Sequence, residues 1–124
     1  MAVILIIDDD DQFRQMLRQM LERAGYEVVE ASDGKEGLKL FRENQVDLVI
    51  TDIFMPEKEG LEVIMEFRRN FPDKKIIAIS GGYRKISPEE TLQMSEAFGA
   101  KYSFKKPVER EKLLEAIKEL LQEI

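Results

Sequence analysis

Three aspartates, a serine and a lysine have the side chains needed to act together on a phosphoryl group. Asp8 and Asp9 follow a short apolar run, Asp52 follows another, and Ser80 and Lys106 follow two more. Carboxylates offer oxygen ligands to a hard cation such as Mg²⁺, and ammonium and hydroxyl groups donate to phosphoryl oxygens. A carboxylate can also be a nucleophile. The set predicts a phosphoryl-transfer site, if the fold brings its members together.

The composition removes most other kinds of chemistry. The 124 residues include no Cys and no His, which excludes disulfides, thiolate sites, Ser-His-Asp triads and His-ligated zinc. Twenty-five acidic residues against 19 Lys and Arg give a net charge of −6, which argues against general binding to nucleic acid or to anionic membranes. Chemistry must therefore use carboxylates, hydroxyls, lysines, backbone groups or a hard cation.

The length fits a single domain over residues 1–124, without a linker or repeat. The opening MAVILIIDDD lacks the basic start and the long apolar run of a signal peptide or membrane span, so we expect a cytoplasmic protein without a membrane partner. The sequence fits either a stand-alone domain or a piece of a larger protein with an output domain elsewhere.

Apolar runs alternate with amphipathic segments five times along the chain. The runs predict strands at Val3–Ile7, Tyr26–Ala31, Val46–Thr51, Ile76–Ile79 and Tyr102–Phe104, with helices over about 13–24, 33–44, 61–70, 88–98 and 109–121. Methionines on the helical stripes are predicted to lie in the core: Met16, Met20, Met65 and Met94. Strict alternation predicts a parallel sheet with helices on both faces.

In such a sheet, ligands bind beyond the carboxyl ends of the strands. The acidic pair at 8 and 9, Asp52, Ser80 and Lys106 each follow a predicted strand, so we expect them to meet at one edge. Three carboxylates there would repel one another unless a cation lies between them, and an oxygen-only ligand set suits Mg²⁺.

Four segments in order resemble one family over essentially the whole chain. They are VILIIDD, LVITDIFMPEKEGLEV, the serine after IIAI and the Lys-Pro pair before the last helix. Together they resemble the CheY-like receiver domain of two-component response regulators. The resemblance implies a doubly wound, flavodoxin-like α/β fold with a five-stranded parallel sheet in the order 2-1-3-4-5 and five helices on its two faces.

The resemblance also implies roles for single residues. Asp52 would accept a phosphoryl group from the phosphohistidine of a histidine kinase, from a phosphotransfer protein or from a small phosphodonor. Asp8, Asp9, Asp52 and the backbone carbonyl of Phe54 would hold Mg²⁺.

Two further residues would act on the phosphoryl group itself. Ser80 would move toward the acyl phosphate, and Lys106 would contact it, with a cis peptide bond to Pro107. The implied function is a phosphorylation-dependent switch that changes the binding of a downstream protein or output domain, with self-phosphorylation and autodephosphorylation as its only reactions.

Three positions depart from the common receiver pattern. Ser103 replaces the usual aromatic switch residue, and Tyr102 is expected to face the other side of the strand. Gly81 and Gly82 follow Ser80 in a segment that we expect to be mobile. Phe54 cannot orient an attacking water, so we expect slow loss of the phosphoryl group.

Two other functions remain open at this point. The Asp8–Asp10 triplet resembles the DxD of a haloacid-dehalogenase-type phosphatase, although Gln12 stands where that pattern has Thr or Ser. A receiver that acts only as an unphosphorylated scaffold is the other alternative, but it would have no need of an intact acidic site.

Overall fold

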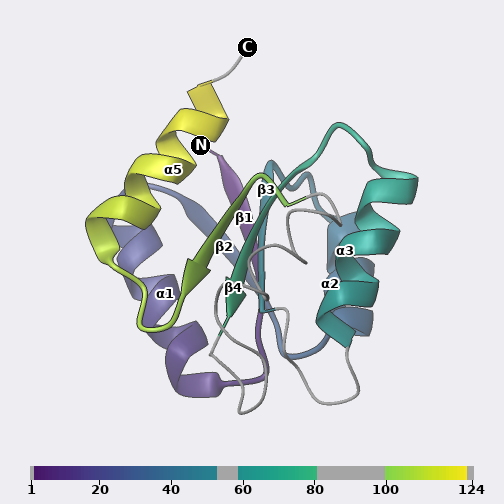
Figure 1. Ribbon diagram of the computed structural model, residues 1–124, viewed down its shortest axis with the longest axis horizontal. Helices are drawn as coiled ribbons and strands as arrows, with labels where there is room; N and C mark the ends of the chain where they lie inside the picture. The colour runs from purple at the N-terminus through teal and green to yellow at the C-terminus, as the bar shows by residue number, and fades with distance from the viewer. Residues whose placement is uncertain (1, 53–58, 81–99, 123–124) are drawn as a thin grey trace.

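The computed structural model describes residues 2–52, 59–80 and 100–122, with residues 59–64 as backbone alone. Within these ranges the strands are β1 (Val3–Ile7), β2 (Glu27–Ala31), β3 (Leu48–Asp52), β4 (Lys75–Ser80) and β5 (Tyr102–Lys105). The helices are α1 (Asp11–Arg23), α2 (Gly34–Glu43), α3 (Glu59–Asn70) and α5 (Arg110–Gln122) (Figure 1). The helix predicted over 88–98, the glycines at 81 and 82, and Phe54 all lie outside the described residues.

The five strands form one parallel sheet in the order β2-β1-β3-β4-β5, as predicted. β1 and β3 lie inside the sheet and are buried almost throughout, which explains why their sequences are continuously apolar. β5 is an edge strand among the described residues, and none of its four residues is fully buried. Because all strands are parallel, their carboxyl ends share one edge of the sheet.

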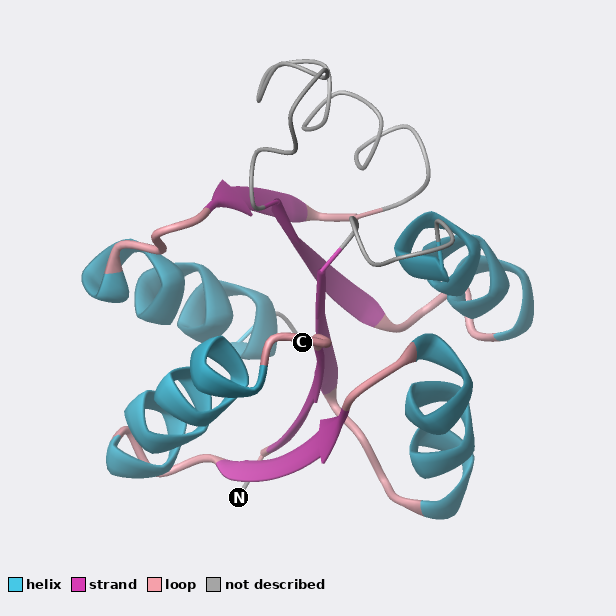
Figure 2. Ribbon diagram, turned by 90° about the horizontal axis from the view of Figure 1, so that it is seen from below, coloured by secondary structure: helices cyan, strands magenta, loops and turns pink. Residues whose placement is uncertain are grey.

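Helices cover both faces of the sheet (Figure 2). Alternate side chains of the strands build a core on each face. One core packs the strands against α1 and α5, and includes Leu17, Leu21, Leu113 and Ile117. The other core packs them against α2 and α3. It contains three aromatic rings in contact, Phe41, Phe67 and Phe71, with Phe41 meeting the other two at 4.7 and 4.5 Å between centroids.

Local sequence determines where the helices begin and end. Asp10 is the N-cap of α1 and accepts from the N–H groups of Gln12 and Phe13, while Asp33 caps α2 through the N–H of Glu36. Gly25 follows the end of α1 with a φ of 96°, a conformation that favours glycine.

The prediction that the helical methionines are core residues was wrong at two positions. Met16 is 43% exposed and Met65 is 41% exposed. Each precedes a fully buried residue, Leu17 or Phe67, by one or two positions, which turns it away from the centre of the buried stripe. Met20 lies partly buried against the core, and Met94 is outside the described residues.

Among the described helices, none has the length and apolar character required to cross a bilayer.

Candidate functional site

Two buried carboxylates lie where the two central strands end. Asp52 is the last residue of β3 and Asp8 directly follows β1, and they are only 5% and 2% exposed. Asp9, one residue further, is exposed. One carboxylate oxygen from each of the three lies within 4.8 Å of the other two. The sequence prediction that these aspartates meet is therefore confirmed, and their oxygen-only ligand set fits Mg²⁺.

Lys106 contacts both buried carboxylates through its side chain and the end of β4 through its backbone. Its Nζ lies 3.0 Å from Oδ2 of Asp8 and 3.2 Å from Oδ2 of Asp52. Its backbone N–H donates to the carbonyl oxygen of Ser80 at 2.7 Å, which ties the end of β5 to the end of β4. Lys105, the preceding residue, is exposed, so the two adjacent lysines have different environments.

Charge and burial act in opposite directions on the ionisation of this site. Burial raises the pKa of Asp8, against the opposing effects of the Asp10 N–H and of Lys106. Burial alone would lower the pKa of Lys106, but the nearby carboxylates of Asp52 and Asp8 outweigh it and raise that pKa. The raised pKa of Lys106 keeps its side chain a cation beside the two buried carboxylates.

The loop that carries Asp8 is held from two directions. Oδ1 of Asp8 accepts from the backbone N–H of Asp10 at 2.8 Å. The Asp8 carbonyl accepts from Nη1 of Arg14 at 2.6 Å, and Nε of the same arginine donates to Glu30 on β2 at 3.0 Å. Arg18 also pairs with Glu30 but has no bond to Asp8 among the described residues. Sequence reasoning missed Arg14, because nothing in the local pattern distinguishes it from other helical arginines.

The structure locates the remaining predicted residues with two exceptions. Ser80 is buried at the end of β4, 1% exposed, and takes part in the bond to Lys106 through its carbonyl. The peptide bond between Lys106 and Pro107 is cis, as the resemblance implied. The predicted ligand Phe54 and the predicted mobile segment after Ser80 lie outside the described residues.

The side chains of β5 alternate as the sequence predicted. Tyr102 and Phe104 stack at 6.5 Å and both pack against the core under α1 and α5. Ser103 pairs with Ala78 of β4, and Ala78 belongs to the core on the opposite face. Neither aromatic side chain therefore occupies the face to which position 103 points.

Comparison with known proteins identifies the family to which this arrangement belongs. The family model described as "Response regulator receiver domain" matches residues 4–118. The chain belongs to the response regulator receiver family. A receiver is a phosphorylation-dependent switch of two-component systems, and receiver domains bind Mg²⁺ at an acidic pocket.

Relatives of the receiver differ greatly in length. It is 35% identical to the chemotaxis protein CheY of Thermotoga maritima over 115 residues, which cover 92% of each chain. It is 38% identical over 114 residues to the CAI-1 autoinducer sensor kinase/phosphatase CqsS of Vibrio cholerae and 36% identical over 119 residues to the response regulator MprA of Mycobacterium. The match covers 92% and 96% of the receiver, but only 16% and 50% of those two proteins.

Solved structures share the fold over nearly the whole receiver. A receiver domain protein from Clostridium thermocellum superposes with a TM-score of 0.88 at 32% identity, covering 98% of this chain and 94% of its own. The response regulator TrrA of Thermotoga maritima, in complex with Mg(2+)-BeF, has a TM-score of 0.85 at 36% identity and is covered over its full length, with 98% of this chain.

Proposed function

We propose that this receiver takes a phosphoryl group on Asp52, from the phosphohistidine of a histidine kinase or phosphotransfer protein or from a small phosphodonor. One observation carries the proposal. The Asp52 carboxylate ends β3 in a buried position, 3.2 Å from the ammonium of Lys106, within a cluster of carboxylate oxygens suited to a divalent cation. Nucleophile, donor and cation ligands thus share one edge of the sheet.

Apart from Mg²⁺, the transfer requires only groups that the site and the donor supply. A carboxylate oxygen of Asp52 attacks phosphorus, forming an O–P bond as the N–P bond of phosphohistidine breaks, and the leaving imidazole keeps that electron pair. Lys106 already lies against an Asp52 oxygen and can donate to the phosphoryl oxygens that arrive there. Ser80, buried at the end of the neighbouring strand, supplies a second donor.

Asp8, Asp9 and Asp52 would hold Mg²⁺, with the backbone carbonyl of Phe54 as a further ligand. The ion supplies positive charge that offsets the repulsion between the incoming phosphoryl group and the carboxylates. The burial of Asp8 supports this assignment, because a buried carboxylate is stabilised by a neighbouring cation.

The phosphorylated receiver would act by changing its binding to a downstream protein or to an output domain. Its reactions would be self-phosphorylation and slow autodephosphorylation in the cytoplasm, without direct contact with nucleic acid or membrane. The slow loss rests on Phe54, and the dephosphorylation rates of wild type and Phe54→Asn test it. A wild type that loses the group faster than the variant would refute this part.

Intact-mass measurement after incubation with a small phosphodonor and Mg²⁺ tests the central assignment. Wild type should gain the mass of one phosphoryl group, and Asp52→Ala should gain none. Asp47→Ala is the matched control, because Asp47 is an exposed aspartate that precedes the same strand and lies at its other end. An equal mass gain in wild type and Asp52→Ala would overturn the assignment.

A further inference from the structure

The ring of Phe13 lies against the ammonium of Lys106. Phe13 is in the first turn of α1, half-buried, and Nζ of Lys106 lies 4.2 Å from the centre of its ring. We propose that Phe13 is a positioning residue whose aromatic face holds the Lys106 ammonium in the site. The proposal deepens the proposed function, because it rests on Lys106 working beside Asp52.

Four residues form a closed circuit around this contact. Nζ of Lys106 pairs with Oδ2 of Asp8, and Oδ1 of Asp8 accepts from the N–H of Asp10. The carboxylate of Asp10 accepts from the N–H of Phe13 at 3.1 Å, and the Phe13 ring lies against Lys106. The N-cap that starts α1 thus also fixes the ring relative to the site.

The distance and burial of the ammonium indicate a cation–π interaction rather than a simple van der Waals contact. A cation within about 6 Å of an aromatic centroid is attracted to the ring face, and more strongly when water is excluded. Lys106 has a side chain only 18% exposed. The other such contact among the described residues, Lys74 with Phe41, is longer at 5.9 Å and involves an exposed lysine.

An aromatic face suits this task better than another carboxylate. A ring attracts a cation without demanding a particular hydrogen-bond direction, so Nζ can exchange oxygen partners while it stays over the ring. Lys106 already divides its donors between Asp8 and Asp52, and transfer to Asp52 brings further oxygens to the same place. The ring also adds no negative charge to a site that already contains three carboxylates.

Proton and carbon chemical shifts of the Lys106 side chain test the contact itself. The wild-type ε-methylene protons should lie upfield of those of exposed lysines, because they are shielded by the ring face, and the signal is assigned by its loss in Lys106→Met. Phe13→Leu should move the signal downfield toward the other lysines, and Phe13→Tyr should keep it upfield. An unchanged signal in Phe13→Leu would overturn the proposal.

The rate of Asp52 phosphorylation by a small phosphodonor at saturating Mg²⁺ tests the consequence. Phe13→Leu should be slower by about three- to tenfold, the range expected for loss of a partly desolvated cation–π contact, and Phe13→Tyr should remain within about twofold of wild type. Phe71→Leu is the matched control, because it removes another half-buried ring that packs with Phe41 and Phe67 in the other core. Equal slowing in Phe71→Leu would reduce the effect to general destabilisation and refute the proposal.

The two measurements separate this proposal from the proposed function. If wild type takes no phosphoryl group, the proposed function fails, while the chemical shifts of Lys106 still decide whether Phe13 positions it. If wild type is phosphorylated and Phe13→Leu matches it in both rate and shift, only the role of Phe13 fails.

Discussion

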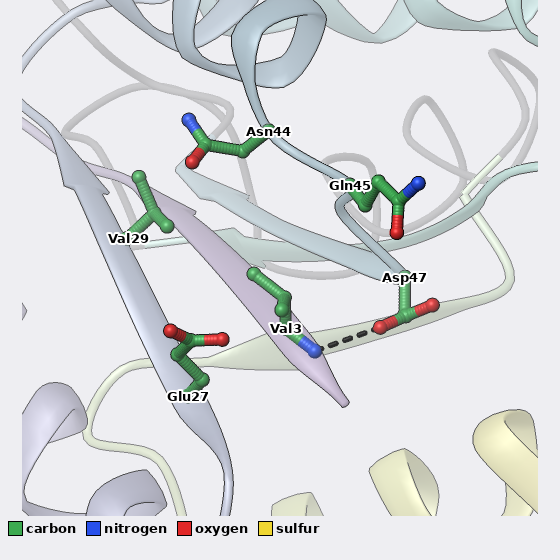
Figure 3. Close-up of a pocket in the computed structure, with 6 residues that line it drawn as sticks. All are labelled: Val3, Glu27, Val29, Asn44, Gln45 and Asp47. Carbon is green, nitrogen blue, oxygen red and sulfur yellow. Dashed lines mark hydrogen bonds between the residues drawn. The ribbon is translucent and has the colours of Figure 1, made fainter. Parts of the chain in front are cut away.

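The two ends of the central sheet both carry acidic side chains, but they use them differently. At the amino end, a pocket of about 480 Å³ is lined by Val3, Glu27, Val29, Asn44, Gln45 and Asp47 (Figure 3). Asp47 is exposed and accepts from the N–H of Val3 at 2.7 Å, so it satisfies the first backbone donor of β1. No lysine or arginine lines this pocket, and its carboxylates form no ion pair with another described residue.

At the carboxyl end, Asp8 and Asp52 are buried and share the ammonium of Lys106. Burying charge is costly unless it is paired, and here the Lys106 ammonium contacts both buried carboxylates. An exposed aspartate that completes a strand has no such cost. The contrast teaches that acidity alone does not mark a site, whereas buried carboxylates clustered around a shared lysine do.

Removing the shared cation should have the largest effect. Lys106→Met should slow phosphorylation of Asp52 by a small phosphodonor by about a hundredfold, because it removes the donor nearest the developing charge. Lys105→Met should stay close to wild type, since that lysine is exposed. The rate of acyl-phosphate formation measures both. Similar rates in the two variants would contradict a specific role for Lys106 in the phosphorylation of Asp52.

The second prediction concerns the anchoring of the acidic loop. Arg14→Lys keeps the charge but loses the planar group that bonds the Asp8 carbonyl and Glu30 together. Its affinity for Mg²⁺ should fall about three- to tenfold, at the lower end of the effects known for groups that support metal ligands. Calorimetric titration with Mg²⁺ measures this. Arg18→Lys, which pairs with the same Glu30 without touching Asp8, should bind as wild type does.

Without metal, the stability of the receiver should depend on pH through Asp8. The folded-state pKa of Asp8 is raised above the ordinary value of 3.8, so its contribution to stability is complete below that pH. That contribution is lost as the pH rises through the folded-state pKa. As the pH rises through this range, the free energy of unfolding of Asp8→Asn should therefore increase relative to that of wild type. Urea unfolding in the presence of a chelator measures this difference.

Asp47→Asn provides the comparison for that experiment, because its carboxylate is exposed at the opposite end. Its unfolding free energy should respond to added Mg²⁺ as that of wild type does, because Asp47 is not part of the carboxylate cluster. Added Mg²⁺ should narrow the difference between Asp8→Asn and wild type. Parallel curves for Asp8→Asn and wild type without metal would show that folding does not raise the pKa of Asp8.

The smallest effect is expected at the amino end. Asp47→Ala removes one exposed hydrogen bond to Val3 and should lower the free energy of unfolding by about 1 kcal/mol or less, with phosphorylation unchanged. Denaturant unfolding and the mass assay measure these two quantities. A slower phosphorylation in this variant would show that the two ends are not independent.

The fold was predictable because each element has its own local pattern. The apolar run before Asp8 is β1, Asp33 is the N-cap of α2, and Gly25 follows the end of α1. Boundaries shifted where tertiary contacts decide them: β3 begins at Leu48 rather than Val46 and includes Asp52 itself. Asp52 is thus the last residue of its strand, whereas Asp8 lies just beyond its own, and both are buried.

The charged residues of the site could be predicted from the sequence, but the residues that hold them in place could not. Asp8, Asp52 and Lys106 follow strands, and parallel topology brings strand ends together. Phe13 and Arg14 lie in a helix, where an aromatic or basic residue has many ordinary uses. Only the packing of α1 against the sheet shows that one contacts Lys106 and the other the Asp8 carbonyl.

One cation divided between two buried carboxylates also constrains how this receiver can vary. Replacing Lys106 changes the cost of keeping Asp8 and Asp52 ionised, so the three positions are epistatic and their substitutions will not add. A neutral residue at position 8 is least harmful when position 106 has already lost its charge. Related sequences should therefore conserve or replace Asp8, Asp52 and Lys106 together. The exposed Lys105 beside them should vary independently.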